Sequence, residues 1–143
     1  MQKSRKSSEI TDVNALGMYD FRMGEIENDP IYPYPTLRIY GHRGYAGYLV
    51  HIRFEETVYL ACAPSFDYGF IWRMATEEEA ARLHVLADED RAQVYCLEEN
   101  MSLYRTPLQR EARQFFIVAW GLEITVEYDE RFEFIVSNWG QPV

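Results

Sequence analysis

Apolar and polar residues alternate along several stretches of this chain, a pattern typical of half-buried β-strands. The clearest stretch is 45–54, where the apolar residues at even positions share one face. It follows a strand at 37–40 and a glycine-rich turn. The pair Glu55-Glu56 is predicted to turn the chain into the next strand. Further predicted strands lie at 18–23, 57–63, 68–74, 92–97 and 101–105.

The longest alternation runs from Phe116 to Tyr128, where every even position is apolar. Its parity passes through Gly121 without a slip, so we predict one long strand that bends or bulges at this glycine. The segment 107–113 before it begins beside a Thr-Pro pair suited to a helix start, and a short helix is predicted there.

The last apolar positions predict a returning strand at 132–136. For the apolar faces of the two strands to coincide, the connecting loop must be 129–131. Glu127 then lies opposite Glu133, with Glu123 further along the same face, although like charges directly opposite each other destabilise a sheet. Two explanations compete: pairing with arginines of the same chain, or an acidic patch for a basic partner. The arginines considered for the first are Arg131, Arg110 and Arg113.

The clearest helix is predicted at 76–87, where Thr76 and Glu79 have the spacing of a capping box. A shorter helical piece is predicted at 10–16, because its apolar residues recur at helical spacing. Strands still outnumber helices. We therefore predict an α+β fold: a mainly antiparallel, strongly bent sheet that can curl into a small, partly closed barrel, with one covering helix at about 76–87 and short helical pieces.

Charge is the one unusual feature of the composition. The 143 residues carry a net charge of −9, but residues 1–9 hold three basic and one acidic residue. Residues 10–143 therefore hold 11 basic and 22 acidic residues, a net of −11, and all 11 cations are arginines. We predict a flexible basic tail over 1–9 and a single domain over 10–143. Such an acidic body binds nucleic acid poorly and suits a basic partner.

The apolar runs are too short to cross a bilayer. No apolar stretch follows the basic N-terminus, as a signal peptide would require, so a cytoplasmic protein with no membrane partner is expected. Cys62 and Cys96 both fall in apolar, strand-like segments. Buried free thiols are favoured over a disulfide.

One glycine-rich loop carries a basic pair: Gly41, His42, Arg43 and Gly44. Backbone amides in such a loop can hold phosphate. The loop lies between predicted strands, however, and lacks the Lys-Ser/Thr ending of a nucleotide-binding loop. A hairpin turn is the favoured interpretation.

The three histidines are too few and too scattered for a zinc site. His51 and Cys62 lie on neighbouring predicted strands but on different faces, whereas a nucleophilic Cys–His pair needs both side chains in one cleft. No metal, no cofactor and no catalytic residue is expected.

Aromatic residues are more numerous than one core of this size needs, which suggests that Tyr68 and Trp72 contact a partner. The candidate partner-binding set is Glu123, Glu127, Glu133, Tyr68 and Trp72, with Gly41, His42, Arg43 and Gly44 as a candidate loop.

Three functions follow from these patterns. The first is a small, acidic, non-catalytic module that binds or regulates a basic protein, in the manner of inhibitors and immunity proteins. The second is a self-assembling small barrel of the SH3 or Sm-like kind, whose edge strands pair between subunits and whose aromatic residues stack on single-stranded nucleic acid. The third is an enzyme with a carboxylate or thiol site.

Overall fold

The computed structural model describes residues 2–16, 20–28, 34–42, 48–61, 65–67, 69–83, 92–103, 106, 109–136 and 139. In chain order its elements are β1 (Gln2–Ser7), the 3₁₀ helix η1 (Ile10–Leu16), β2 (Asp20–Glu27), β3 (Thr36–His42), β4 (Tyr48–Ala61), β5 (Ser65–Asp67), β6 (Phe70–Met74), α1 (Glu77–Leu83), β7 (Gln93–Glu99), η2 (Met101–Leu103), β8 (Gln114–Asp129), η3 (Glu130–Phe132) and α2 (Glu133–Val136).

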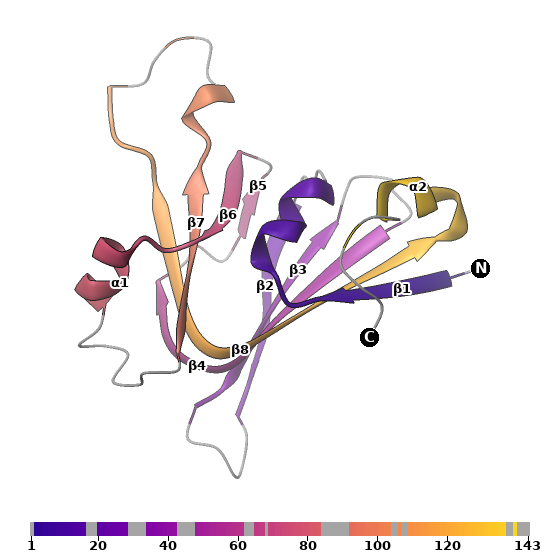
Figure 1. The fold of residues 1–143 in the computed structure, drawn as a ribbon, viewed down its shortest axis with the longest axis horizontal. Coiled ribbons are helices and arrows are strands. Elements are labelled where there is room, and N and C mark those ends of the chain that lie inside the picture. The colour runs from indigo at the N-terminus through magenta and orange to yellow at the C-terminus, as the bar shows by residue number, and fades with distance from the viewer. Residues whose placement is uncertain are drawn as a thin grey trace.

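All strands belong to one antiparallel sheet with the order β5-β2-β3-β4-β8-β7-β6, and β1 also pairs with β8. One edge of β8 pairs with β4 along almost its full length, while its other edge pairs first with β7 and then with β1. The long ribbons of β4 and β8 bend together (Figure 1). The predicted α+β class with a bent antiparallel sheet is confirmed, and the sheet does not close into a barrel.

The bend lies in the middle of β4, where the sequence predicted a turn at Glu55-Glu56. That prediction is wrong, because β4 is a continuous strand of 14 residues. Glu56 has a positive φ of 50°, and the pairing with β8 slips between Thr57 and Tyr59, as in a β-bulge. Gly121 of β8 lies opposite Glu55, and a Cβ atom there would come within 2.9 Å of its carboxylate. The predicted single long strand through Gly121 is confirmed as β8. The bulge lies in the neighbouring strand β4 and not at Gly121 itself.

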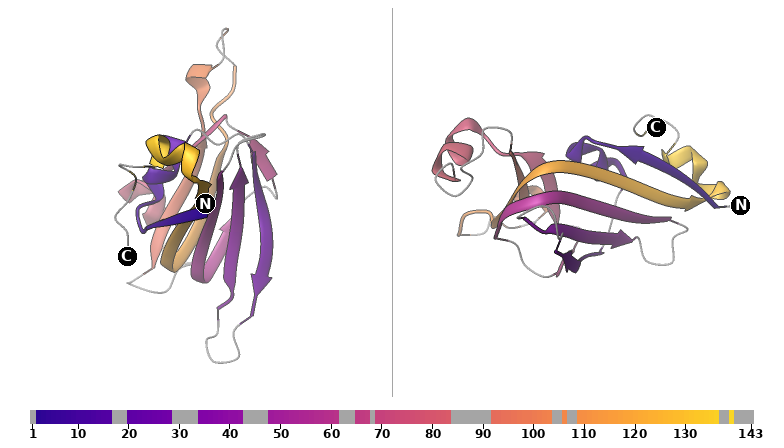
Figure 2. Two further views of the ribbon diagram at one scale, coloured as in Figure 1. Left: turned by 90° about the vertical axis from the view of Figure 1, so that its right-hand side faces the viewer. Right: turned by 90° about the horizontal axis from the view of Figure 1, so that it is seen from below.

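The short helices η1 and α2 lie on the same side of the sheet (Figure 2). Both contribute buried residues to the apolar core cluster. η1 buries Ile10, Val13 and Leu16, which confirms the helical piece predicted at 10–16. In β8 the predicted even-numbered face is buried from Ile124 to Tyr128. Before Gly121 both faces are buried: the odd-numbered Ile117 and Ala119 join the core cluster, and the even-numbered Val118 is also fully buried.

The strand predicted at 132–136 is wrong, since these residues form the end of η3 and the helix α2. Both edges of β8 are already paired, so no edge remains for a returning strand. Asp129 starts η3, its carboxylate accepting a hydrogen bond from the backbone N–H of Arg131. The helix predicted at 107–113 is absent over 109–113, and 101–103 is a 3₁₀ turn rather than a strand.

The flexible tail predicted for residues 1–9 is also wrong, because residues 2–7 form β1. Its register on β8 runs from Gln2 opposite Asp129 to Ser7 opposite Ile124. The alternation of polar and basic residues in this segment contains no apolar position, so periodicity gave no strand signal.

The outer edge of β6 is covered by a side chain. The amide of Asn14, in η1, donates to the carbonyl of Trp72 at 2.7 Å and accepts from its backbone N–H at 2.9 Å. One asparagine therefore satisfies both the N–H and the carbonyl that Trp72 turns toward the outer edge of the sheet. Such covering of an edge opposes edge-to-edge association, the step on which the self-assembly hypothesis depends.

We predict that Asn14→Ala lowers the free energy of unfolding by about 1–2 kcal/mol, because two backbone groups lose their partner. Asn14→Asp retains the acceptor for the Trp72 N–H but places a carboxylate oxygen against the Trp72 carbonyl, so it should destabilise the protein as well. Urea unfolding measures the change, and light scattering over a range of concentrations reports any new association through β6. Wild-type stability in both variants would show that the Asn14 contacts are without consequence.

The helix α1 is held by a buried ion pair as well as by its cap. Glu79 and Thr76 form the predicted capping box, with bonds of 2.9 and 3.2 Å. The carboxylate of Glu79 also accepts two hydrogen bonds from Arg73, at 2.7 and 2.9 Å, and its side chain is only 8% exposed. The Arg73 guanidinium is the main cause that lowers the pKa of Glu79 to about 2.

This ion pair makes stability depend on acidity. Between the ordinary pKa of 4.5 and about 2, the unfolded chain binds a proton at Glu79 that the folded chain does not. The pair therefore contributes fully above the ordinary value and is lost as the pH falls. We predict that Glu79→Gln costs about 3 kcal/mol at neutral pH, and that this cost shrinks between about pH 5 and about pH 3. Urea unfolding across this range tests it, with the exposed Glu78→Gln as the matched control; a cost independent of pH would exclude the mechanism.

Candidate functional site: a polar pocket at the bend of β4

The three glutamates of the predicted acidic face do not form one surface. Glu123 and Glu127 lie on β8, whereas Glu133 is the first residue of α2. The predicted opposition of Glu127 and Glu133 is wrong, because Glu127 lies between Leu49 on β4 and Ser4 on β1.

Each of these glutamates has a basic neighbour. Glu133 lies 3.0 Å from the Lys3 ammonium and 3.1 Å from Arg5, and Glu123 lies 3.9 Å from Lys6. Glu127 lies 3.2 Å from the His51 ring. The hydrogen bond from Lys3 is the main cause that lowers the pKa of Glu133. Each of the three therefore lies beside a basic group of the same chain, although not beside the arginines that the sequence suggested, and a role of this surface toward a basic partner stays a prediction.

The expected arginines bind other carboxylates. Arg110 donates two hydrogen bonds to Glu99, at 2.5 and 2.9 Å, and Arg113 donates to the same carboxylate, whose side chain is 1% exposed. Arg131 pairs with Asp129. The contacts of Arg110 and Arg113 with Glu99 hold the segment before β8. None of the three arginines pairs with the glutamates of the predicted face in a contact of the described residues.

Of the two predicted aromatic contacts, Trp72 is not available to a partner. Trp72 is 1% exposed and packs between Phe21 and Phe54, at ring-centroid distances of 6.3 and 5.9 Å. It is therefore part of the core and cannot meet a partner. Tyr68 lies outside the described residues.

The candidate loop is only partly described. Gly41 and His42 are the last residues of β3, while Arg43 and Gly44 lie outside the described residues. The phosphate-binding and hairpin interpretations of this loop therefore stay predictions.

The thiol hypothesis meets a chemical obstacle at Cys96. This residue is free and fully buried, and burial raises the pKa of its thiol to about 11. Very little thiolate, the nucleophilic form, exists at neutral pH at such a site. Cys62 lies outside the described residues, so its pairing with His51 stays untested. Within the described ranges, no group of three or more metal-ligating residues gathers, and no helix there has the length and apolarity to span a bilayer.

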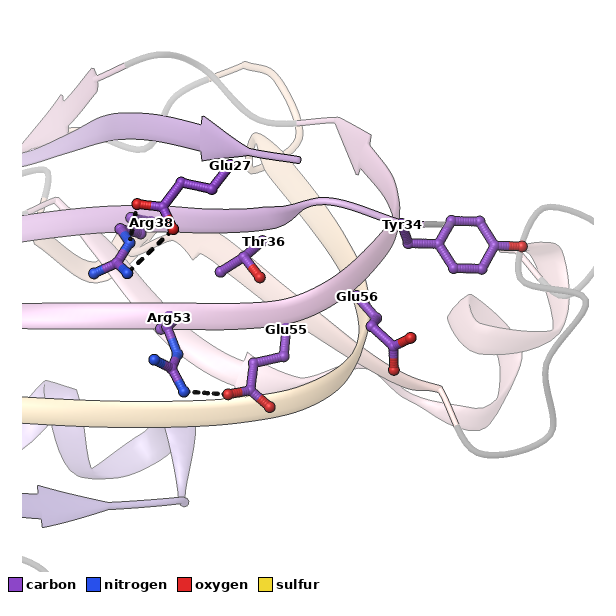
Figure 3. Close-up of a pocket in the computed structure, with 7 residues that line it drawn as sticks. All are labelled: Glu27, Tyr34, Thr36, Arg38, Arg53, Glu55 and Glu56. Atoms are coloured by element: carbon purple, nitrogen blue, oxygen red, sulfur yellow. Dashed lines mark hydrogen bonds and ion pairs between the residues drawn. The ribbon is translucent and has the colours of Figure 1, made fainter. Parts of the chain in front are cut away.

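A polar pocket of about 430 Å³ lies where β2 ends, β3 begins and β4 bends (Figure 3). Its lining residues are Glu27, Tyr34, Thr36, Arg38, Arg53, Glu55 and Glu56. Neighbouring strands supply them: Glu27 is opposite Thr36 in the register of β2 and β3, and Arg38 is opposite Arg53 in that of β3 and β4.

Two arginines directly opposite each other would repel, and each is neutralised by a glutamate. Arg38 contacts Glu27 through Nε at 3.1 Å and Nη2 at 3.3 Å. Arg53 pairs with Glu55, two residues along its own strand. Figure 3 shows both ion pairs toward one end of the pocket and Tyr34 and Glu56 toward the other.

Glu56 is the unusual member of this group. It is half-buried and forms no hydrogen bond or ion pair with any described residue. Its φ of 50° lies in the left-handed region, which costs a residue with a side chain about 1–2 kcal/mol. The lining has three carboxylates and two guanidinium groups, so the charge of Glu56 is the one in excess. Glu56 thus combines a strained backbone with a half-buried carboxylate that no described cation neutralises.

Comparisons with known proteins add no relative: the chain matches no protein-family model, no curated protein and no solved structure. Its class is therefore defined by fold and site alone. It is a small α+β domain with an open, bent antiparallel sheet and a polar pocket at the bend.

The left-handed backbone at Glu56 leads to a stability prediction. Glycine lacks the Cβ atom that makes a positive φ unfavourable, so Glu56→Gly should raise the free energy of unfolding by about 0.5–1 kcal/mol. Glu55→Gly is the matched control: it loses the Arg53 contact without relief of strain and should destabilise the protein. Urea unfolding distinguishes the two. If Glu56→Gly destabilises as much as Glu55→Gly, the strain at Glu56 is not real.

Proposed function

We propose that this protein is a non-catalytic binding module that holds a cationic side chain of a protein partner in the pocket at the bend of β4. The observation that carries this proposal is Glu56, the pocket carboxylate without a counter-ion among the described residues. A lysine or arginine of the partner would supply that counter-ion, with the hydroxyl group of Thr36 as a further acceptor in the same lining.

A cation fits this pocket better than an anion. Both pocket arginines already contact glutamates, so an anion would have to displace Glu27 or Glu55. The net charge of −9 repels anions and attracts a basic partner over long range. That attraction mainly raises the association rate and falls as salt is added.

The contribution of one such contact is modest. A half-exposed ion pair is worth about 0.2–1 kcal/mol, and a charge-assisted hydrogen bond about 1.5–3 kcal/mol. The pocket therefore selects a basic group within a larger interface and does not hold the partner alone.

The test uses acetyl-arginine amide as the probe, with acetyl-citrulline amide as its neutral isostere. We expect amide shifts at Thr36 and between Arg53 and Thr57 in ¹⁵N correlation spectra with the arginine compound only. Glu56→Gln keeps the shape of the side chain but removes its charge, and should weaken this response at least about fivefold.

Glu111→Gln is the matched control, since Glu111 is an exposed glutamate outside the pocket lining. It should leave the response unchanged. Equal shifts with the citrulline compound, or an undiminished response in Glu56→Gln, would refute the proposal.

A further inference from the structure

The N-terminal strand β1 is attached to β8 without any apolar side chain. Its sequence is Gln-Lys-Ser-Arg-Lys-Ser, and its register partners are residues 124–129 of β8. Burial of apolar surface, the main stabilising term in folding, therefore gains little from its side chains. β1 is held by backbone hydrogen bonds and by charge.

Two of the three cations that hold β1, Lys3 and Lys6, form exposed and therefore weak ion pairs, whereas Arg5 is 19% exposed and lies 3.1 Å from Glu133. Lys3 lies 3.0 Å from Glu133 and 3.9 Å from Glu130, and the side chains of these three residues are between 36% and 62% exposed. The pair of Lys6 with Glu123 is longer, at 3.9 Å, and also half-exposed. Exposed ion pairs contribute little and are screened by salt.

The strand β8 does not depend on β1. Its other edge pairs with β4 over the same residues, and Ile124, Val126 and Tyr128 are buried in the core. The next element along the chain, η1, is anchored by its own buried residues. Ser8 and Glu9, which connect β1 to η1, are exposed. β1 can therefore leave β8 by rotation at Ser8 and Glu9, with the loss of one side-chain contact to η1, the hydrogen bond that the Ser7 hydroxyl donates to the Asp12 carboxylate.

We infer that this edge of β8 is a strand-addition site for a basic, extended segment of a partner protein, and that β1 occupies it as an intramolecular substitute. Strand addition joins an extended segment to a sheet edge by backbone hydrogen bonds, while side chains give specificity. This site is separate from the pocket at the bend, and the inference does not rest on the proposed function.

The contacts of β1 define the segment that fits. Lys3 and Arg5, two residues apart, lie on one face and both reach Glu133. Lys6 lies on the other face, opposite Thr125, and reaches Glu123. The site therefore selects the pattern basic-x-basic-basic in an extended conformation, where x is the small position of Ser4 opposite Glu127.

The probe is a fluorescein-labelled peptide with the sequence of residues 1–8. In the wild-type chain the tethered β1 competes at a high effective concentration, so the peptide should bind weakly. Lys3→Glu combined with Arg5→Glu repels β1 from Glu133, and the full-length double variant should bind the peptide at least about tenfold more tightly than wild type. Equal affinity for the two proteins would overturn the inference.

Two controls separate strand addition from general charge attraction. A peptide of the same composition in scrambled order should bind the double variant more weakly; equal binding would mean that only charge is recognised, and the inference would fail. Adding Glu133→Gln to the double variant should reduce affinity for the original peptide, whereas adding Glu56→Gln should not. A loss with Glu56→Gln would place the peptide in the pocket instead.

Hydrogen exchange on the wild-type chain keeps the inference testable even if the double variant does not fold. We expect the amides of β1 to exchange faster than those of β7, and faster still as NaCl rises from about 50 to about 300 mM. Protection of β1 equal to that of β7 at both concentrations would show a permanent strand, and no partner could then replace it.

Discussion

The pairing of β8 with β4 through a shared bend is the constraint on which the rest of this structure depends. Once β4 takes one edge of β8, only the other edge is left, and β7 and β1 divide it between them. No third segment can pair there, so the chain after Asp129 becomes helical. The bend also requires one residue of β4 to leave ordinary strand geometry, and this residue is Glu56. The candidate pocket is thus a consequence of how two long strands curve together.

The same sheet also determines which carboxylates the cations of the chain contact. Acidic residues exceed basic ones by nine, so the protein must either expose carboxylates or share its few cations among them. Arg73 with Glu79, and Arg110 with Glu99, use two-point contacts to almost fully buried carboxylates. A planar guanidinium makes such contacts and a lysine ammonium does not. The arginines of residues 10–143, where lysine is absent, are therefore suited to these buried carboxylates.

The cations of β1 and the arginines of residues 10–143 therefore neutralise different carboxylates. The arginines of the body satisfy buried or half-buried carboxylates and hold α1 and the segment before β8 in place. The lysines and arginine of β1 neutralise glutamates at the surface of β8 and α2. Only Glu56 among the pocket carboxylates lacks a partner within the described residues. The two proposed binding sites, the pocket at the bend of β4 and the edge of β8, rest on these local charges and not only on the net charge of the chain.

Much of the local structure follows from the sequence. Alternation predicted the strands that pair in the middle of the sheet, and Thr76 with Glu79 predicted the start of α1 through a capping box that the structure contains. Spacing predicted the helical turns of η1 with their three buried residues. These features depend on neighbours a few residues apart, which is why a single sequence is enough to find them.

Edge occupancy and backbone conformation were decided by the tertiary structure. Residues 132–136 have strand-like alternation, yet they form a helix because β1 already pairs with the edge they would need. Residues 2–7 have no apolar alternation, yet they form a strand because β8 offers a free edge and acidic neighbours. Glu55-Glu56 resembles a turn in sequence, and only the pairing with β8 makes it the bulge of a continuous strand. Pairing partners are distant in the chain, so their competition for the same hydrogen-bonding edges cannot be seen in local sequence.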